Sequence, residues 1–254
     1  MIKGFSILLP TYNMLPWLKI CIRSIQKNSR LDNQICIHVD GSTDETAHWL
    51  TEQGIAYTIA SHKGMYSAWN KAAEQATKDY LFQGEDDLYF CPGWDVNLAK
   101  WLEKIEKDTV IVARLIEPFP GSFPPIVDCG RTPEDFNESK LLRWAQDNSE
   151  HKLIKQAFGL WTISRKIWNK IGGYDTAYDP TGVGNGDLKM KFCTQAGIKR
   201  FRLASDVQMY HFKPQPELIP YSVNHSKVGK NIIRFKEKWG MMPEEAAAKI
   251  WLKE

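Results

Sequence analysis

The stretch Tyr80-Leu-Phe-Gln-Gly-Glu-Asp-Asp87 places three consecutive carboxylates directly after a short apolar run. The run predicts a buried strand over 80–83, so Glu85, Asp86 and Asp87 stand at the carboxyl end of that strand. Packing like charges at such a point costs stability unless a cation neutralises them. A divalent metal with oxygen ligands would do so and could bridge the two phosphates of a nucleotide diphosphate. A solvated acidic turn is the alternative interpretation.

Strands and helices alternate along the chain before this stretch. The predicted elements are, in order, a strand over 5–9, a helix over 15–26, a strand over 35–39, a helix over 46–53, a strand over 57–60 and a helix over 65–77. Alternation at this pitch predicts an α/β fold, with a mainly parallel central sheet flanked by helices on both faces.

Polar residues follow three of these strands. Thr11, Tyr12 and Asn13 come after the first strand, Asp40 after the second, and the acidic residues after the fourth. In open α/β sheets, ligands bind outside the carboxyl ends of the strands. The sequence therefore predicts one binding site at this rim of the sheet.

The chain is less regular beyond the acidic residues. Four prolines and a glycine between 117 and 125 break regular structure, and residues 116–155 are predicted to form an irregular insertion with one helix over 139–146. Such insertions often serve as lids or binding loops. The other predicted elements here are helices over 98–107, 165–171, 187–196 and 243–253, and strands over 110–115, 159–164 and 207–212.

Composition excludes little. The 254 residues are 43% hydrophobic and 25% charged, and a net charge of +3 does not by itself argue for nucleic acid or a membrane surface. The five cysteines are scattered, which favours reduced thiols. The apolar run at 5–9 is far shorter than a membrane span. We expect a soluble, cytoplasmic protein with no nucleic acid partner.

Five short motifs stand in a fixed order: Pro10-Thr-Tyr-Asn13, Val39-Asp-Gly-Ser-Thr-Asp44, Lys63-Gly-Met-Tyr-Ser-Ala-Trp-Asn70, Phe82-Gln-Gly-Glu-Asp-Asp87 with Pro92-Gly-Trp94, and Gly172-Gly-Tyr-Asp175. In this order and spacing they resemble the motifs of the family 2 glycosyltransferases of the GT-A fold, over most of residues 5–212. The resemblance implies a GT-A domain over 1–212, with a nucleotide-binding half over 1–95 and an acceptor-side half over 96–212. Residues 213–254 would form a C-terminal helical extension.

The resemblance also implies a set of ligand-binding residues. The predicted nucleotide-binding residues are Pro10, Thr11, Tyr12, Asn13, Asp40, Lys63, Gly64, Asn70 and Asp86. In the family, the aspartate that matches Asp40 contacts the base. The predicted metal ligands are Asp87 and Glu85, with His211 completing the shell of a manganese or magnesium ion. A histidine that is merely hydrogen-bonded at a strand end is the alternative for His211.

Two departures from the family pattern concern charged residues. A basic residue is common just before the asparagine that matches Asn70, but this chain has Trp69, so Lys63 or Lys71 would supply the charge. The catalytic-base region usually reads Glu-Asp followed by Asp-Leu, whereas this chain has only Gly184-Asn-Gly-Asp-Leu188. Asp187 is therefore the predicted base of an inverting transfer, and Asp175 is the fallback. An N-cap of the following helix is the alternative role for Asp187.

These features together predict a metal-dependent glycosyltransferase. It would move a sugar from a nucleotide diphosphate, with UDP the commonest carrier in the family, to a hydroxyl of a saccharide or lipid-linked acceptor. A non-catalytic sugar- or protein-binding module on the same fold is an alternative. A sugar nucleotidyltransferase is another, although its glycine-rich, arginine-containing loop is absent after the first strand.

A basic, amphipathic segment lies over 227–239, where lysines and an arginine interleave with apolar residues. Such a segment can make weak peripheral contact with an anionic membrane, close over a diphosphate, or present an ordinary solvated face.

Overall fold

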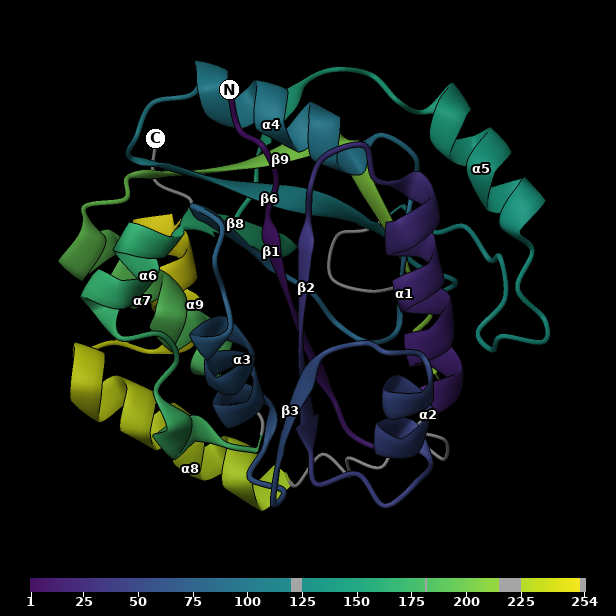
Figure 1. Ribbon diagram of the computed structural model, residues 1–254. Coiled ribbons are helices and arrows are strands. Elements are labelled where there is room, and N and C mark those ends of the chain that lie inside the picture. The colour runs from purple at the N-terminus through teal and green to yellow at the C-terminus, as the bar shows by residue number, and fades with distance from the viewer. Residues whose placement is uncertain (120–124, 181, 215–224, 252–254) are drawn as a thin grey trace.

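The computed structural model describes residues 1–119, 125–180, 182–214 and 225–251. The middle of the predicted proline-rich break and the last residues of the predicted C-terminal helix lie outside these ranges. The described part of the chain forms one mixed, nine-stranded sheet between two layers of helices (Figure 1). Its strands are β1 (Ser6–Thr11), β2 (Gln34–Asp40), β3 (Tyr57–Ala60), β4 (Tyr80–Gln83), β5 (Leu88–Phe90), β6 (Thr109–Ile116), β7 (Leu153–Lys155), β8 (Leu160–Ser164) and β9 (Arg200–His211).

The strand order is β3-β2-β1-β4-β8-β6-β9-β5, with β7 beside β9. The first four strands of this order are parallel, which confirms the alternating strand–helix prediction for the N-terminal half. Beyond them the sheet is mixed, because β8 runs antiparallel to both β4 and β6 while β6 and β9 are parallel. The carboxyl ends of β1, β2 and β4 therefore meet at one rim, as the polar residues that follow them require.

The helices are α1 (Leu15–Asn28), α2 (Thr46–Glu52), α3 (Met65–Glu74), α4 (Trp94–Lys104), α5 (Glu138–Asp147), α6 (Arg165–Ile171), α7 (Gly184–Ala196), α8 (His225–Trp239) and α9 (Pro243–Ala246). Side chains that alternate along β1 show how two layers form. Ile7 and Leu9 join a core with Ile22 of α1, whereas Leu8 joins a core with Trp69 of α3. Alternate side chains of a strand point to opposite faces of the sheet, so these two cores are the two interfaces between sheet and helices.

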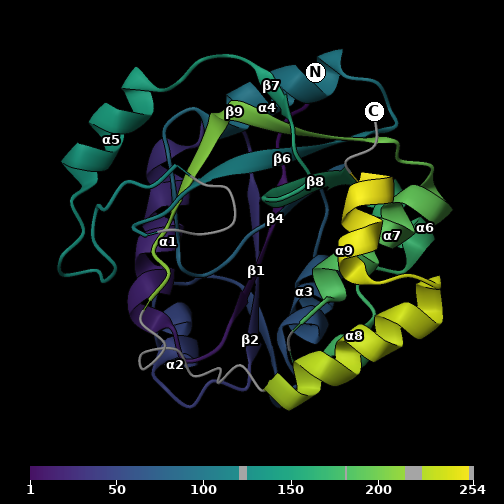
Figure 2. The same ribbon diagram turned by 180° about the vertical axis from the view of Figure 1, so that it is seen from behind.

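The C-terminal helices pack against the same face as α7 (Figure 2). Phe235 of α8 and Ala246 of α9 are completely buried in the core that contains Phe192 of α7. The predicted C-terminal extension therefore contributes to the main core.

Several elements differ from the prediction. The short strands β5 and β7 were not predicted, and α7 begins at Gly184 instead of Asp187. The strand predicted over 207–212 is the end of β9, which begins at Arg200. Its pairing with β6 shifts register between Ala113 and Arg114, and this irregularity separates the two halves of the strand.

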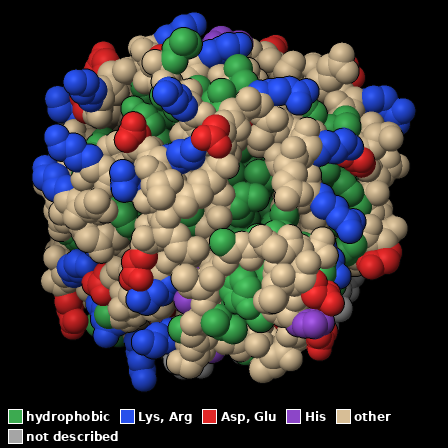
Figure 3. All heavy atoms as spheres, in the orientation of Figure 1, with side chains coloured by type: hydrophobic (Ala, Val, Ile, Leu, Met, Phe, Trp, Pro, Cys, Tyr) green, Lys and Arg blue, Asp and Glu red, His purple; other side chains and the backbone are tan. Residues whose placement is uncertain are grey.

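Charged side chains are dispersed over the face seen in Figure 3, where lysine and arginine lie among aspartate and glutamate. None of the helices in the described ranges is both long and apolar enough to span a membrane.

Candidate metal and nucleotide site

The acidic residues occupy the short loop between β4 and β5, which several elements hold in place. The Gly84 amide donates to the carbonyl of Leu8 at 2.9 Å, and a Cβ at Gly84 would lie only 2.8 Å from that oxygen, so the close approach to β1 requires glycine. On the other side, the indole N–H of Trp69 donates to the Gly84 carbonyl at 2.9 Å. The Cys21 thiol donates to the Glu85 carbonyl at 3.4 Å. The carboxylates that follow therefore start from a fixed backbone.

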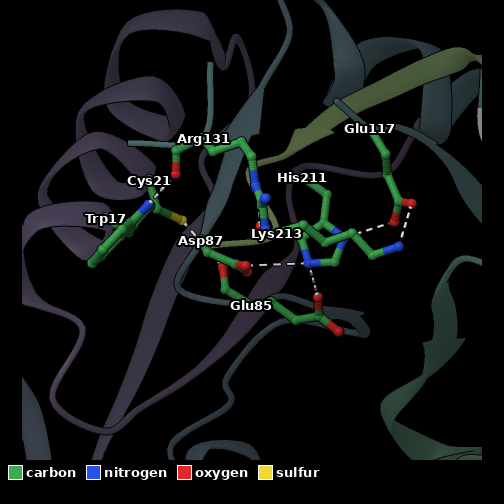
Figure 4. A network of polar contacts seen from close by, with 8 residues as sticks. All are labelled: Trp17, Cys21, Glu85, Asp87, Glu117, Arg131, His211 and Lys213. Carbon is green, nitrogen blue, oxygen red and sulfur yellow. Dashed lines mark hydrogen bonds and ion pairs between the residues drawn. The ribbon is translucent and has the colours of Figure 1, made fainter. Parts of the chain in front are cut away.

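Pairing of β5 with β9 brings His211 to this loop, because Leu88 lies opposite His211 in the ladder. The Nε2 atom of His211 lies 3.2 Å from Asp87 Oδ2 and 3.6 Å from Glu85 Oε2 (Figure 4). One ligand atom from each of the three side chains lies within 4.8 Å of the others. Two carboxylates and an imidazole form a donor set that suits manganese or magnesium, so the side chains present fit the predicted metal.

Glu117, which follows β6, orients the histidine. Its Oε1 atom accepts a hydrogen bond from Nδ1 of His211 at 2.9 Å, and its Oε2 atom accepts one from Nζ of Lys213 at 2.6 Å. The Arg131 guanidinium donates to the Lys213 carbonyl (Figure 4). An ionised carboxylate only accepts hydrogen bonds, so Nδ1 must carry the proton and Nε2 faces the acidic loop. Carboxylates commonly hold metal-binding histidines in this way.

The electrostatics of the cluster follow from burial and mutual repulsion. Burial, together with the charges of Asp87 and Glu117, raises the pKa of Glu85 to about 7. Burial and the neighbouring Asp87 raise the pKa of Asp86 well above its ordinary value. Burial alone would lower the pKa of His211, but the carboxylates around it raise that pKa well above its ordinary value. Negative charge is therefore concentrated here, which favours a bound cation.

A cavity of about 310 Å³, which we call the acidic cavity, opens over this cluster. Pro10 of β1 and Met65 and Trp69 of α3 form its apolar wall, opposite the three carboxylates and His211. The predicted metal ligands therefore lie together with the predicted nucleotide-binding residues Pro10 and Asp86.

Asp40 sits at the end of β2 and is 1% exposed. Its carboxylate accepts hydrogen bonds from the backbone amides of Lys63 and Gly64 at 3.0 and 2.9 Å, and pairs with Nδ1 of His62 at 2.8 Å. Asp40 thus holds the loop that precedes α3. The ring of His62 in turn stacks on Tyr12, with 4.1 Å between ring centroids.

The remaining predicted nucleotide-binding residues differ in their positions and hydrogen bonds. The Thr11 side chain is buried beside the acidic loop, where its hydrogen bond opposes the rise in the pKa of Asp86. Asn13, at φ 53°, accepts hydrogen bonds from the amides of Thr43 and Asp44, and so links the loops after β1 and β2. Asn70 instead bonds the backbone of Tyr174, so the structure places it at the acceptor-side motif.

A second cavity of about 350 Å³ shares Glu85 with the acidic cavity, and we call it the acceptor cavity after the predicted acceptor-side half of the chain, which supplies most of its lining. Gln83, Trp161, Asn185 and Lys189 also line it. Asn185, in the first turn of α7, accepts a hydrogen bond from the Tyr174 hydroxyl at 2.7 Å. Among the described lining residues, Glu85 is the one carboxylate.

Neither of the two predicted base residues is among the lining residues of this cavity. Asp187 is completely buried, and its Oδ1 atom accepts from the indole N–H of Trp239 and pairs with Nζ of Lys238, both at 2.8 Å. Asp175 pairs with the same ammonium group at 2.8 Å. Asp187 lies inside the first turn of α7, whose N-cap is Val183, so the N-cap alternative for Asp187 is wrong. Both carboxylates hold α8 against the core.

Three residues that shape the site were not predicted from the sequence: Glu117, Asn185 and Trp69, whose indole N–H holds the acidic loop. Glu117 stands in the proline-rich segment, where no periodicity marks a buried side chain. A signal for Trp69 was available, because it replaces a basic residue in the motif before the acidic loop.

Comparisons with known proteins place the chain among glycosyltransferases. The model of the family described as Glycosyl transferase family 2 matches residues 6–157. The chondroitin synthase of Escherichia coli is 29% identical over 92 residues, which are 34% of this chain and 13% of that protein. A PGL/p-HBAD biosynthesis glycosyltransferase of Mycobacterium bovis is 29% identical over 120 residues, or 44% of this chain and 46% of that protein. The chain thus spans less than half the length of these curated relatives.

Solved structures share the fold at low sequence identity. GalNAc-T7 with UDP, GalNAc and Mn²⁺ has a TM-score of 0.66 and 16% identity, over 94% of this chain and 49% of that one. TarS of S. aureus with UDP-GlcNAc has a TM-score of 0.64 and 13% identity, over 92% and 66%. The mannosyltransferase PcManGT from Pyrobaculum calidifontis with GDP-Man and Mn²⁺ has a TM-score of 0.60 and 18% identity, over 96% and 67%. The predicted GT-A fold is confirmed.

Proposed function

Since the chain belongs to glycosyl transferase family 2, we propose that it transfers a sugar from a nucleotide diphosphate donor to a hydroxyl acceptor and depends on a divalent metal. The observation that carries this proposal is the cluster of Glu85, Asp87 and His211 on the wall of the acidic cavity. These three side chains would hold manganese or magnesium. The bound ion would neutralise the diphosphate and so make it a better leaving group.

The donor is proposed to be a UDP-sugar. UDP or UDP-GlcNAc is bound in GalNAc-T7 and TarS, although PcManGT holds GDP-Man on the same fold. The nucleobase of the donor would lie beside Tyr12 and the loop that Asp40 holds, at the carboxyl ends of β1 and β2. The diphosphate would then extend toward Asp86 and the metal ligands.

Transfer with inversion is part of the proposal. In-line displacement requires the acceptor hydroxyl to approach the sugar carbon from the side opposite the departing diphosphate. Two cavities that share Glu85 as a common wall provide separate spaces for the two groups. Asp187 is not retained as the base, because it is buried and bound to Lys238 and Trp239.

The acceptor is proposed to be a saccharide or a lipid-linked glycan. Peripheral membrane contact through 227–239 stays a prediction, and two of its basic side chains face the protein. Lys238 pairs with Asp175 and Asp187, and Arg234 donates to the Ala177 carbonyl.

Hydrolysis of UDP-GlcNAc and UDP-GalNAc in the presence of manganese tests the proposed function. We expect slow release of UDP by the wild type, and loss of that release in Asp87→Ala. Asp32→Ala is the control, because the Asp32 side chain is 84% exposed and lies away from the site. Failure of the wild type to bind any nucleoside diphosphate with metal would contradict the proposal. Binding without turnover of any donor would favour the non-catalytic module.

A further inference from the structure

A third cavity, of about 490 Å³, adjoins the acceptor cavity, and the two share Leu115, Phe158 and Gly159 as lining residues. We call it the arginine cavity, because Arg114 lies in its wall. The two cavities therefore lie side by side, with Glu85 in the lining of one and Arg114 in the lining of the other.

Arg114 lacks a carboxylate partner within ion-pair distance in the described part of the chain. Its half-buried guanidinium makes a long hydrogen bond, 3.4 Å, to the Asn148 carbonyl. The two carboxylates that influence it electrostatically, Asp206 and Glu150, have closer partners. Asp206 binds His151 at 2.6 Å and Trp101 at 2.7 Å, and Glu150 pairs with Lys152. The positive charge of Arg114 is thus left without a neutralising contact.

The other charged residues of the cavity neutralise each other. Glu117 pairs with Lys213 at 2.6 Å and also accepts from His211. Counting Arg114 and Lys213 as positive and Glu117 as negative, the described lining carries a formal charge of +1. Burial lowers the pKa of Arg114, which shows that its surroundings disfavour an uncompensated positive charge. An anionic ligand would remove that penalty.

The chemistry of the wall suits a charged sugar. A planar guanidinium can donate two parallel hydrogen bonds to a carboxylate or a phosphate. Trp144 also lines the cavity and offers aromatic surface for the apolar face of a sugar ring. We propose that the arginine cavity binds an anionic group, carboxylate or phosphate, carried by the acceptor saccharide. The role of this saccharide as the acceptor rests on the proposed function, whereas the preference for an anionic saccharide rests on the cavity alone.

Binding of three small probes without nucleotide tests this inference: methyl glucuronide, glucose 6-phosphate and the neutral methyl glucoside. Ligand-observed NMR titration measures the affinity of each. We expect at least one charged probe to bind the wild type about tenfold more tightly than methyl glucoside, because a charge-assisted hydrogen-bond pair contributes that much. Which charged probe binds more tightly distinguishes a carboxylate ligand from a phosphate ligand.

Arg114→Gln should abolish the preference for charge, while Trp144→Ala should weaken the binding of charged and neutral probes alike. Equal affinity of the wild type for all three probes would overturn the inference, as would failure of both charged probes to bind. This comparison on the wild type requires no variant, so it stands even if Arg114→Gln does not fold. Binding of UDP with manganese should be unchanged in Arg114→Gln. If the wild type itself does not bind UDP with manganese, the proposed function is refuted instead.

Discussion

Glu117 accepts a hydrogen bond from Nδ1 of His211 at 2.9 Å, and the opposite nitrogen of the same ring lies 3.2 Å from Asp87. One carboxylate thereby sets the tautomer with which the imidazole meets the acidic loop. The site consequently depends on a residue after β6 as well as on the loop after β4.

Glu117→Gln is predicted to lower manganese affinity about tenfold, because loss of a carboxylate behind a metal-binding histidine typically costs that much or more. Titration with manganese followed by electron paramagnetic resonance measures the affinity, and ¹⁵N NMR of the imidazole reports the tautomer. Glu74→Gln, an exposed member of a surface pair with Lys71, is the matched control. Unchanged metal affinity with an unchanged tautomer would show that Glu117 has no positioning role.

Asp187→Asn is predicted to destabilise the fold by about 2 kcal/mol, since it removes a buried partner of Lys238. Turnover per folded molecule should stay within about threefold of the wild type. Removal of a general base would instead lower the turnover number by about a hundredfold or more. Thermal unfolding and turnover assays on the same preparation separate the two outcomes, and a hundredfold loss with intact folding would restore Asp187 as the base.

Asp40→Asn is predicted to weaken UDP and GDP binding by a similar factor. Asp40 is buried and acts through the amides of Lys63 and Gly64. The substitution therefore loosens the loop without changing the preference for one nucleobase over the other. Calorimetric titration with both nucleotides in the presence of manganese gives the ratio of the two affinities. A ratio that changes about tenfold would indicate that Asp40 contacts the base directly.

The ion pair between Lys238 and Asp175 predicts a pH-dependent stability. Burial alone would raise the pKa of Asp175, but the hydrogen bond from Lys238 lowers it below its ordinary value. The unfolded chain has a pKa of about 3.9 for this group, so the contribution is complete above about pH 5 and is lost as pH falls through the folded pKa. Lys238→Met should therefore be less stable than the wild type by about 1–2 kcal/mol at neutral pH.

Urea unfolding of the wild type and Lys238→Met at a series of pH values measures this difference. It should stay constant from neutral pH to about pH 5 and shrink below about pH 4. A difference that persists undiminished at pH 3 would mean that the ion pair with Asp175 does not account for it.

Much of the nucleotide half was predictable because its signals are local. Short apolar runs closed by polar residues marked β1, β2 and β4, and the parallel order of these strands put Asp40 and Asp87 on one rim. The meeting of Asp87 and His211 was also predictable, since the family motif supplies Asp87 and the end of a late strand supplies His211. None of these predictions depends on which face of a helix points to the site.

To predict the acceptor side, one must know which side chains of α7 face the cavity. A sequence pattern specifies this poorly. Starting α7 at Gly184 instead of Asp187 shifts the helix start by three residues. As a result, Asn185 lines the acceptor cavity, while Asp187 lies against Trp239 and Lys238. Glu117 was missed for another reason, because its partner His211 lies 94 residues away in the chain.

The most direct test of the metal site is the anomalous diffraction of crystals soaked with manganese and UDP. We predict a manganese peak bonded to the Asp87 carboxylate and to Nε2 of His211 at roughly 2.0–2.3 Å, next to the diphosphate. Bound UDP without a manganese peak at these two side chains would contradict it.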